Sequence, residues 1–157
     1  MEFTGDDLAG VVDMFGGLTR DDLAAALVEL SFKAGVDVEP SAFDDDIVSA
    51  LRAYELVDLE PETDDALLVA GPAAFPRLPE EAADLHHILD AEQCEIDRAE
   101  AGTAAADKLH SDAVAAIDAG DSPELQRLLD LSYDIETWAP VDLSETRARL
   151  DDELSGE

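Results

Sequence analysis

The residue types best suited to metal chemistry gather in one stretch, where two histidines, two aspartates and the only cysteine lie between residues 86 and 97. If that stretch is a helix, His87, Asp90 and Cys94 follow one another at intervals of three and four residues and share one face. Imidazole, carboxylate and thiolate together can bind zinc or iron, and His110 could supply a fourth ligand. Because forty of the 157 residues are Asp or Glu, such spacings also arise by chance, and we predict that the chain holds no metal and no other cofactor.

Covalent catalysis has weaker support. Cys94 would need a histidine base within hydrogen-bond reach and a site for the oxyanion, yet no glycine-rich elbow surrounds it. The glycines at 16, 17 and 71 do not have the spacing of a phosphate-binding or dinucleotide-binding loop. Paired carboxylates for acid–base work cannot be singled out from forty candidates. The sequence therefore predicts a protein without enzymatic activity.

Tyr133, Trp138 and Pro140 form a candidate contact surface near the C-terminus. Trp is enriched where proteins bind one another. The chain has only five Phe, two Tyr and one Trp, so the favoured interpretation is that these aromatics plug a core between the last helices. Trp138, Tyr133 and the cation Arg52 are the candidate residues for contact with a protein partner.

Basic residues are scarce before residue 97, where Arg20, Lys33, Arg52 and Arg77 are the only ones. Nucleic-acid affinity normally comes from Lys and Arg side chains that release counterions, whereas the predicted third helix carries aspartate at residues 44–46, near its start. Nucleic-acid binding is therefore an alternative to protein contact. It requires the three arginines to converge on one face.

These residues are positioned first by helices predicted over residues 4–15, 19–34 and 40–54. Thr4 and Thr19 are N-cap residues, Pro40 opens the third helix, and apolar residues recur at helical spacing. Two short apolar runs at 56–59 and 66–70 flank a turn-rich stretch and predict a β-hairpin. Three helices followed by a hairpin is the order of a winged helix-turn-helix domain.

A proline-rich connector over residues 75–79 leads to further helices, predicted over residues 80–100, 103–119, 122–137 and 141–154. Gly102 is expected to separate the first of these helices from the second, and Gly120 to end the second helix. The second of these helices is expected to turn inward Leu109, Val114 and Ile117. The predicted fold is mainly α, with a winged-helix-like part at 1–75, a small antiparallel bundle at 79–154 and a frayed tail at 155–157.

The overall charge points to a habitat. Forty acidic residues stand against nine Lys and Arg, for a net charge of -31, while 46% of the residues are hydrophobic. Such a chain folds, but its carboxylates repel one another unless salt screens them. We expect a salt-adapted haloarchaeal cytoplasmic protein, because no apolar run is long enough to span a membrane and no signal peptide is evident. A single cysteine excludes an internal disulfide.

Segments at residues 8–19 (LAGVVDMFGGLT), 67–72 with 75–76, and 133–134 with 138–143 together resemble a family of uncharacterised haloarchaeal proteins. The resemblance covers nearly the whole chain. It implies a halophilic origin, and it implies no activity, cofactor or catalytic residue.

The leading functional hypothesis is a non-enzymatic protein-interaction or regulatory accessory module with an unknown protein partner. The first alternative is a winged-helix transcriptional regulator that binds DNA in high salt. The second is a metal-binding helical protein, which requires His87, Asp90, Cys94 and His110 to approach one another within coordination distance.

Overall fold

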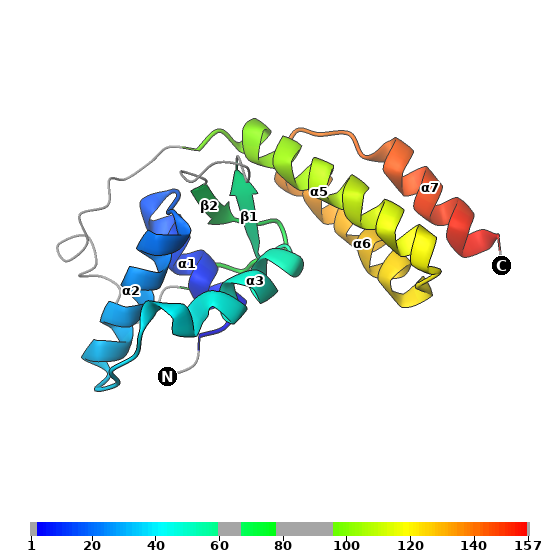
Figure 1. The fold of residues 1–157 in the computed structure, drawn as a ribbon. Helices are drawn as coiled ribbons and strands as arrows, with labels where there is room; N and C mark the ends of the chain where they lie inside the picture. Colours follow the sequence, from blue (N-terminus) through cyan, green and yellow to red (C-terminus); the bar gives the residue numbers. More distant parts are fainter. Residues whose placement is uncertain (1–2, 60–66, 78–95, 157) are drawn as a thin grey trace. The chain divides into compact units, whose positions relative to one another are not determined.

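The computed structural model describes residues 3–59, 67–77 and 96–156 (Figure 1). The chain divides into two compact units, Met1–Ile96 and Asp97–Glu157, which we call the N-terminal and C-terminal units. The described part is mainly helical with one two-stranded antiparallel sheet, which confirms the predicted fold class. Within the described ranges, no helix combines the length and the apolar character needed to cross a membrane.

Helices α1 (Gly5–Phe15) and α2 (Arg20–Lys33) begin where the sequence predicts. The Thr4 hydroxyl accepts a hydrogen bond from the Asp7 backbone N–H at 3.2 Å, and the Asp7 carboxylate accepts one from the Thr4 N–H at 3.0 Å. Thr19 caps α2 through the N–H of Asp22, at 3.1 Å. Each cap satisfies backbone donors that a helix start leaves unpaired.

The predicted third helix is divided into a 3₁₀ turn, η1 (Pro40–Phe43), and helix α3 (Asp44–Arg52). Strands β1 (Leu56–Leu59) and β2 (Leu67–Ala70) then pair antiparallel, with Leu56 opposite Ala70. An isolated bridge between Leu18 and Leu68 joins the hairpin to the loop before α2. The hairpin packs against α1 and α3, in a winged-helix-like arrangement.

The turn from α3 into β1 depends on two backbone features. Tyr54 is fully buried and has a φ of 63°, which is unusual for a residue other than glycine. Gly71 donates its N–H to the Glu55 carbonyl at 2.9 Å, and a Cβ at Gly71 would lie 2.3 Å from the Tyr54 carbonyl oxygen. Only glycine allows β2 to leave the sheet this close to Tyr54.

Large apolar side chains fill the core of the N-terminal unit. They come from both early helices, α3 and the hairpin, and include Leu8, Val11, Phe15, Leu23, Leu27, Leu30, Ile47, Leu56 and Leu68.

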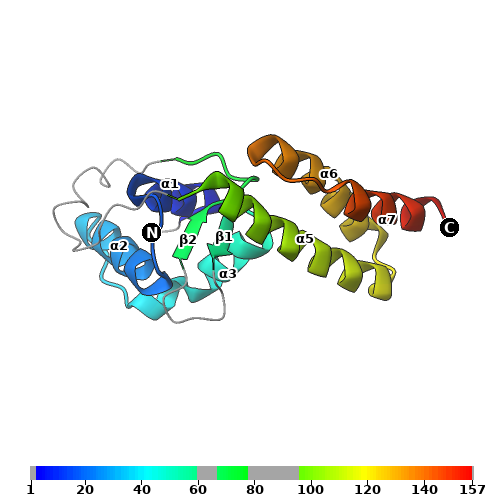
Figure 2. The ribbon, with the colours of Figure 1, turned by 90° about the horizontal axis from the view of Figure 1, so that it is seen from above.

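The C-terminal unit consists of helices α5 (Arg98–Ala119), α6 (Ser122–Trp138) and α7 (Ser144–Ser155). Figures 1 and 2 show these helices side by side, with neighbours in the chain running antiparallel. Gly120 ends α5 with a φ of 63°, and the Asp121 carboxylate caps α6 by accepting from the Glu124 N–H at 3.2 Å. The predicted turn between these helices is confirmed.

Two predictions about α5 are wrong. Gly102 does not interrupt a helix but lies inside α5, where a Cβ would approach the Ala139 Cβ to 2.5 Å. Its role is a close approach between α5 and the segment after α6. Val114 is exposed rather than inward. Small alanines fill most of the inner face of α5, which is formed by Ala101, Ala105, Leu109, Ala113 and Ala116.

Candidate interaction surface

The proposed metal ligands fall mostly outside the described residues. His87, Asp90 and Cys94 lie there, as does most of the helix predicted over 80–100. His110 is exposed on α5. In the ranges that the structure does describe, no group of three or more His, Cys, Asp or Glu side chains is arranged to hold a metal ion.

The basic residues proposed for DNA contact lie on different elements of the N-terminal unit. Arg20 begins α2 and pairs with Asp58 of β1 at 3.4 Å. Arg52 is exposed in the last turn of α3, whose first turn is acidic. Arg77 is exposed in the connector, where its backbone N–H donates to the Asp6 carbonyl at 3.0 Å.

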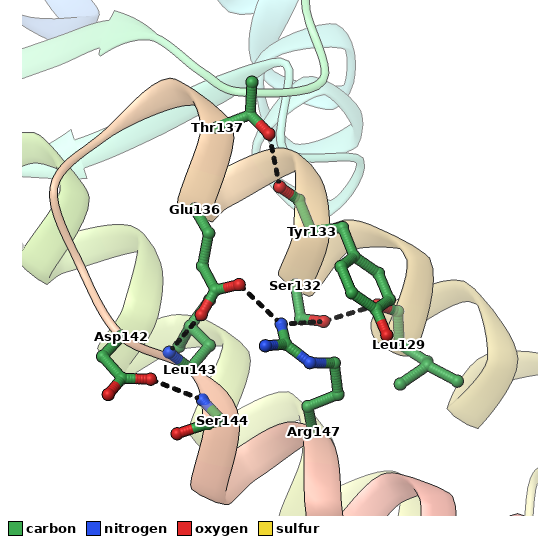
Figure 3. Close-up of polar contacts among 9 residues, drawn as sticks. All are labelled: Leu129, Ser132, Tyr133, Glu136, Thr137, Asp142, Leu143, Ser144 and Arg147. Carbon is green, nitrogen blue, oxygen red and sulfur yellow. Dashed lines mark hydrogen bonds and ion pairs between the residues drawn. The ribbon is translucent and has the colours of Figure 1, made fainter.

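Tyr133 lies on the outer side of α6 and is 54% exposed. The guanidinium carbon of Arg147, on α7, lies 4.4 Å from the centre of the Tyr133 ring (Figure 3). The interpretation of Tyr133 as a core plug is therefore wrong. Its ring is at the surface, and one face is covered by a cation.

Hydrogen bonds to acceptors on α6 hold Arg147 in this position (Figure 3). Its Nη1 donates to Glu136 Oε1 at 2.7 Å and to the Ser132 hydroxyl oxygen at 3.3 Å. The buried Ser132 hydroxyl in turn donates to the Leu129 carbonyl at 2.5 Å. An arginine held by a carboxylate and a hydroxyl attracts the aromatic ring that it covers and restricts its motion.

Glu136 also organises the start of α7. Its Oε2 accepts from the Leu143 backbone N–H at 2.8 Å, at the N-cap position that has no side-chain cap of its own. The hydrogen bonds from Arg147 and from Leu143 lower the pKa of Glu136. Hydrogen bonds from Ser144 likewise lower the pKa of Asp142. Both carboxylates are thus favoured in the charged form, which stabilises the helix start.

Arg98 stacks on the ring of Trp138 in a similar way. The guanidinium carbon of Arg98 lies 4.6 Å from the ring centre, and Arg98 Nη1 donates to the Trp138 carbonyl at 3.1 Å. Trp138 is half-buried where α6 ends. The chain therefore combines aromatic rings with arginine twice in the C-terminal unit.

The exposed face of α6 around Tyr133 follows the helical repeat. Its members are Gln126, Asp130, Tyr133 and Thr137. We call this set the α6 face. The Gln126 amide donates to the Asp130 carboxylate at 3.2 Å, and the Thr137 hydroxyl donates to the Tyr133 carbonyl at 3.0 Å. The face is polar, acidic and centred on one aromatic ring.

Sequence reasoning singled out Tyr133 and Trp138 but missed Glu136, Ser132 and Arg147. Glu136 and Arg147 are eleven residues apart on different helices, so no local spacing joins them. The one available signal in the sequence was that Arg147 is among only nine Lys and Arg residues of the chain.

A family model described as a family of unknown function, DUF7109, matches residues 6–155. The chain belongs to the DUF7109 family. No curated protein and no solved structure matches this DUF7109 chain. The family membership confirms the resemblance to uncharacterised proteins and assigns no chemistry.

Proposed function

We propose that this DUF7109 chain is a non-enzymatic protein-interaction module of a haloarchaeal cytoplasm, and that it contacts its partner through the α6 face. The observation that carries the proposal is Tyr133, an exposed aromatic side chain whose ring is stacked on Arg147. Tyrosine offers a large apolar surface with a polar end, which suits interfaces that must also stay soluble.

A Tyr133 ring that is already restricted by stacking loses less conformational freedom on binding, which reduces the free-energy cost of association. Immobilising a mobile side chain at an interface opposes association. Here the fixation is already supplied by Arg147, which Glu136 and Ser132 hold from α6. Affinity rises when contacting groups are already held in the bound geometry before association.

The scarcity of basic residues supports protein contact over phosphate contact. The first turn of α3, the helix that would enter a DNA groove in a winged-helix domain, holds Asp44, Asp45 and Asp46. These carboxylates repel a phosphate backbone. The winged-helix-like arrangement nevertheless favours a DNA-binding regulator as the second candidate.

The test is capture of partners from a haloarchaeal lysate in molar KCl, with and without nuclease, read by mass spectrometry. Wild type, Tyr133→Ala and Phe32→Ala are compared. Phe32 is a matched control because it is an exposed aromatic residue, 68% exposed, on α2 of the other unit. We expect protein partners that survive nuclease, are lost with Tyr133→Ala and are retained with Phe32→Ala.

Two results would overturn the proposal. Partners that disappear on nuclease treatment, together with recovered nucleic acid, would establish the DNA-binding candidate. Partners lost with Phe32→Ala and kept with Tyr133→Ala would place the contact on α2. Circular dichroism of both variants checks that each remains folded.

A further inference from the structure

The proposed function leaves the chemistry of the partner open, and the surroundings of Tyr133 restrict it. Arg147 covers one face of the ring, yet the side chain remains 54% exposed. More than half of the side chain can therefore be reached by a partner, which would approach the ring on the side away from Arg147. An aromatic face is electron-rich and attracts cations.

Charges in the C-terminal unit favour a cationic partner. From Asp97 to Glu157 there are sixteen Asp and Glu and only five Lys and Arg. Four of these five cations already have partners within the unit: Arg98 on Trp138, Lys108 with Asp112, Arg127 with Glu124, and Arg147 with Glu136. The remaining negative charge complements a positive side chain.

Asp130 is placed to assist such a side chain. It is exposed one turn before Tyr133 on the α6 face, and helical side chains lean toward the N-terminus of their helix, so the Tyr133 ring lies over that turn. A cation stacked on the open ring face would have the Asp130 carboxylate within reach.

A second cation stacked on the Tyr133 ring would face an arginine, Arg147, whose positive charge is already paired. Glu136 accepts a hydrogen bond from Arg147 at 2.7 Å and offsets its charge. The arrangement therefore tolerates cations on both faces of Tyr133.

Arginine fits this position better than lysine. A guanidinium is flat, stacks on aromatic faces and forms paired hydrogen bonds with a carboxylate, whereas an ammonium acts as a strongly hydrated point charge. In molar salt the attraction between point charges is screened over about 3 Å, while short-range stacking persists. The chain itself places guanidinium groups over Tyr133 and Trp138.

We propose that the partner inserts an arginine side chain against the open face of Tyr133, where Asp130 accepts its hydrogen bonds. This inference rests on the proposed function, since it names the chemistry that the α6 face recognises.

Three blocked tripeptides, Gly-Arg-Gly, Gly-Lys-Gly and Gly-Glu-Gly, provide the probes. They are titrated into the full chain in molar KCl, and the Tyr133 ring resonances are followed by NMR. We expect the arginine peptide to bind about two- to fivefold more tightly than the lysine peptide, and the glutamate peptide not to bind. Tyr133→Phe should keep this preference, and Asp130→Asn should reduce it.

The controls separate two kinds of failure. If the three peptides bind alike, or if Asp130→Asn and wild type show the same arginine preference, the arginine inference is wrong. The proposed function then still stands, provided that Tyr133→Ala abolishes capture of the lysate partner. If Tyr133→Ala leaves that capture unchanged, the α6 face is not the contact surface and both proposals fail.

Discussion

The two units build their cores from different side chains. The N-terminal unit buries large residues such as Leu8, Phe15, Leu27 and Tyr54, each 0% exposed. The C-terminal unit packs α5 through an inner face made largely of alanine. Alanine lets helices approach closely but removes less apolar surface from water than leucine or phenylalanine does. On α6 and α7 the C-terminal unit buries large residues as well, among them Leu128, Ile135 and Leu150. The same acidic chain therefore contains one unit with a larger apolar core and one with a smaller core, in which these side chains pack with alanine.

Polar contacts compensate in the C-terminal unit. Its helices are linked by the Glu136–Arg147 pair and by the Arg98 hydrogen bond to the Trp138 carbonyl. In the N-terminal unit, Arg20 and Asp58 form an ion pair at 3.4 Å, with the arginine half exposed. Partly buried pairs depend less on salt than exposed ones. We infer that apolar burial contributes most of the stability of the N-terminal unit, and that polar contacts contribute a larger share in the C-terminal unit.

Of the changes that test this difference between the units, the removal of salt should have the largest effect on stability. At molar KCl the repulsion among forty carboxylates is screened, and near 0.01 M the Debye length rises to about 30 Å. We expect the fold to be lost on dilution, and the C-terminal unit to unfold first because its apolar core is smaller. Trp138 is the only tryptophan, so its fluorescence reports that unit, while far-UV circular dichroism reports both.

Equal stability by both signals at low and high salt would contradict the salt-adapted interpretation. Loss of helix before any change at Trp138 would reverse the order of the two units. An uncharged osmolyte at the same osmotic strength serves as the control for screening.

Leu27→Ala should give the next largest effect. Leu27 is fully buried in the N-terminal core, and such truncations cost about 2–5 kcal/mol through lost burial and a residual cavity. Val48→Ala on α3 is the control, since Val48 is 41% exposed and should change stability by less than about 0.5 kcal/mol. Urea unfolding in molar KCl measures both, followed by circular dichroism and by Trp138 fluorescence.

If the units are stabilised separately, Leu27→Ala shifts the circular dichroism transition and leaves the Trp138 transition in place. A shift of both signals by the same amount would show that the two units unfold together, and the contrast between their cores would then have no separate thermodynamic meaning.

Gly102→Ala tests the tight packing of the C-terminal unit. A mid-helix glycine replaced by alanine normally gains about 1 kcal/mol of helix propensity. Here the new Cβ would lie 2.5 Å from the Ala139 Cβ, and overpacking costs about 1–3 kcal/mol. We expect a net loss of about 1 kcal/mol in the Trp138 urea transition. Thr103→Ala, at the next and exposed position, should show no such loss.

A stabilised Gly102→Ala chain would mean that the segment around Ala139 moves aside at little cost. The close approach would then contribute little to holding α5 in place.

Gly102 also shows where sequence reasoning reaches its limit. The caps at Thr4, Thr19 and Asp121 were predictable because a cap involves residues three positions apart. The residues next to a glycine in the sequence do not tell whether it ends a helix or lets another segment pack closely against the helix. The deciding neighbour, Ala139, is 37 residues away along the chain.

The candidate surface was predictable in part for the same reason. Tyr133 stood out by residue type, but its exposure depends on how α7 packs against α6. Arg147 and Glu136 meet only because the α6–α7 loop brings their helices together. The sequence shows the type of each residue, whereas the contacts between side chains become known only from the fold.

The smallest effects concern two glutamates whose pKa values shift in opposite directions. Burial, followed by repulsion from Asp6, raises the pKa of Glu55 in the N-terminal unit. Hydrogen bonds from Arg147 and Leu143 lower the pKa of Glu136 in the C-terminal unit. Acidification in molar KCl should therefore act on the two units with opposite signs.

The signs follow from linkage between protonation and folding. The lowered pKa of Glu136 gives stability that is present above the ordinary carboxyl pKa and is lost as pH falls through the folded-state value. The raised pKa of Glu55 gives stability that is present below the ordinary value and is lost as pH rises through the folded-state value. At neutral pH the charged Glu136 thus stabilises its unit, and the charged Glu55 destabilises its own.

Glu136→Gln should destabilise the C-terminal unit at pH 7 by about 1 kcal/mol, and the difference from wild type should fade under acid. Glu55→Gln should stabilise the N-terminal unit at pH 7 by about 0.5 kcal/mol, and this difference should also fade under acid. Urea unfolding at several pH values measures both, with the exposed Glu153→Gln on α7 as the control. The Glu55 carboxyl lies against Gly5, the first residue of α1. If Glu55→Gln instead loses stability at pH 7, the attraction between this carboxylate and the positive end of α1 outweighs its burial, and the two units respond to acid with the same sign.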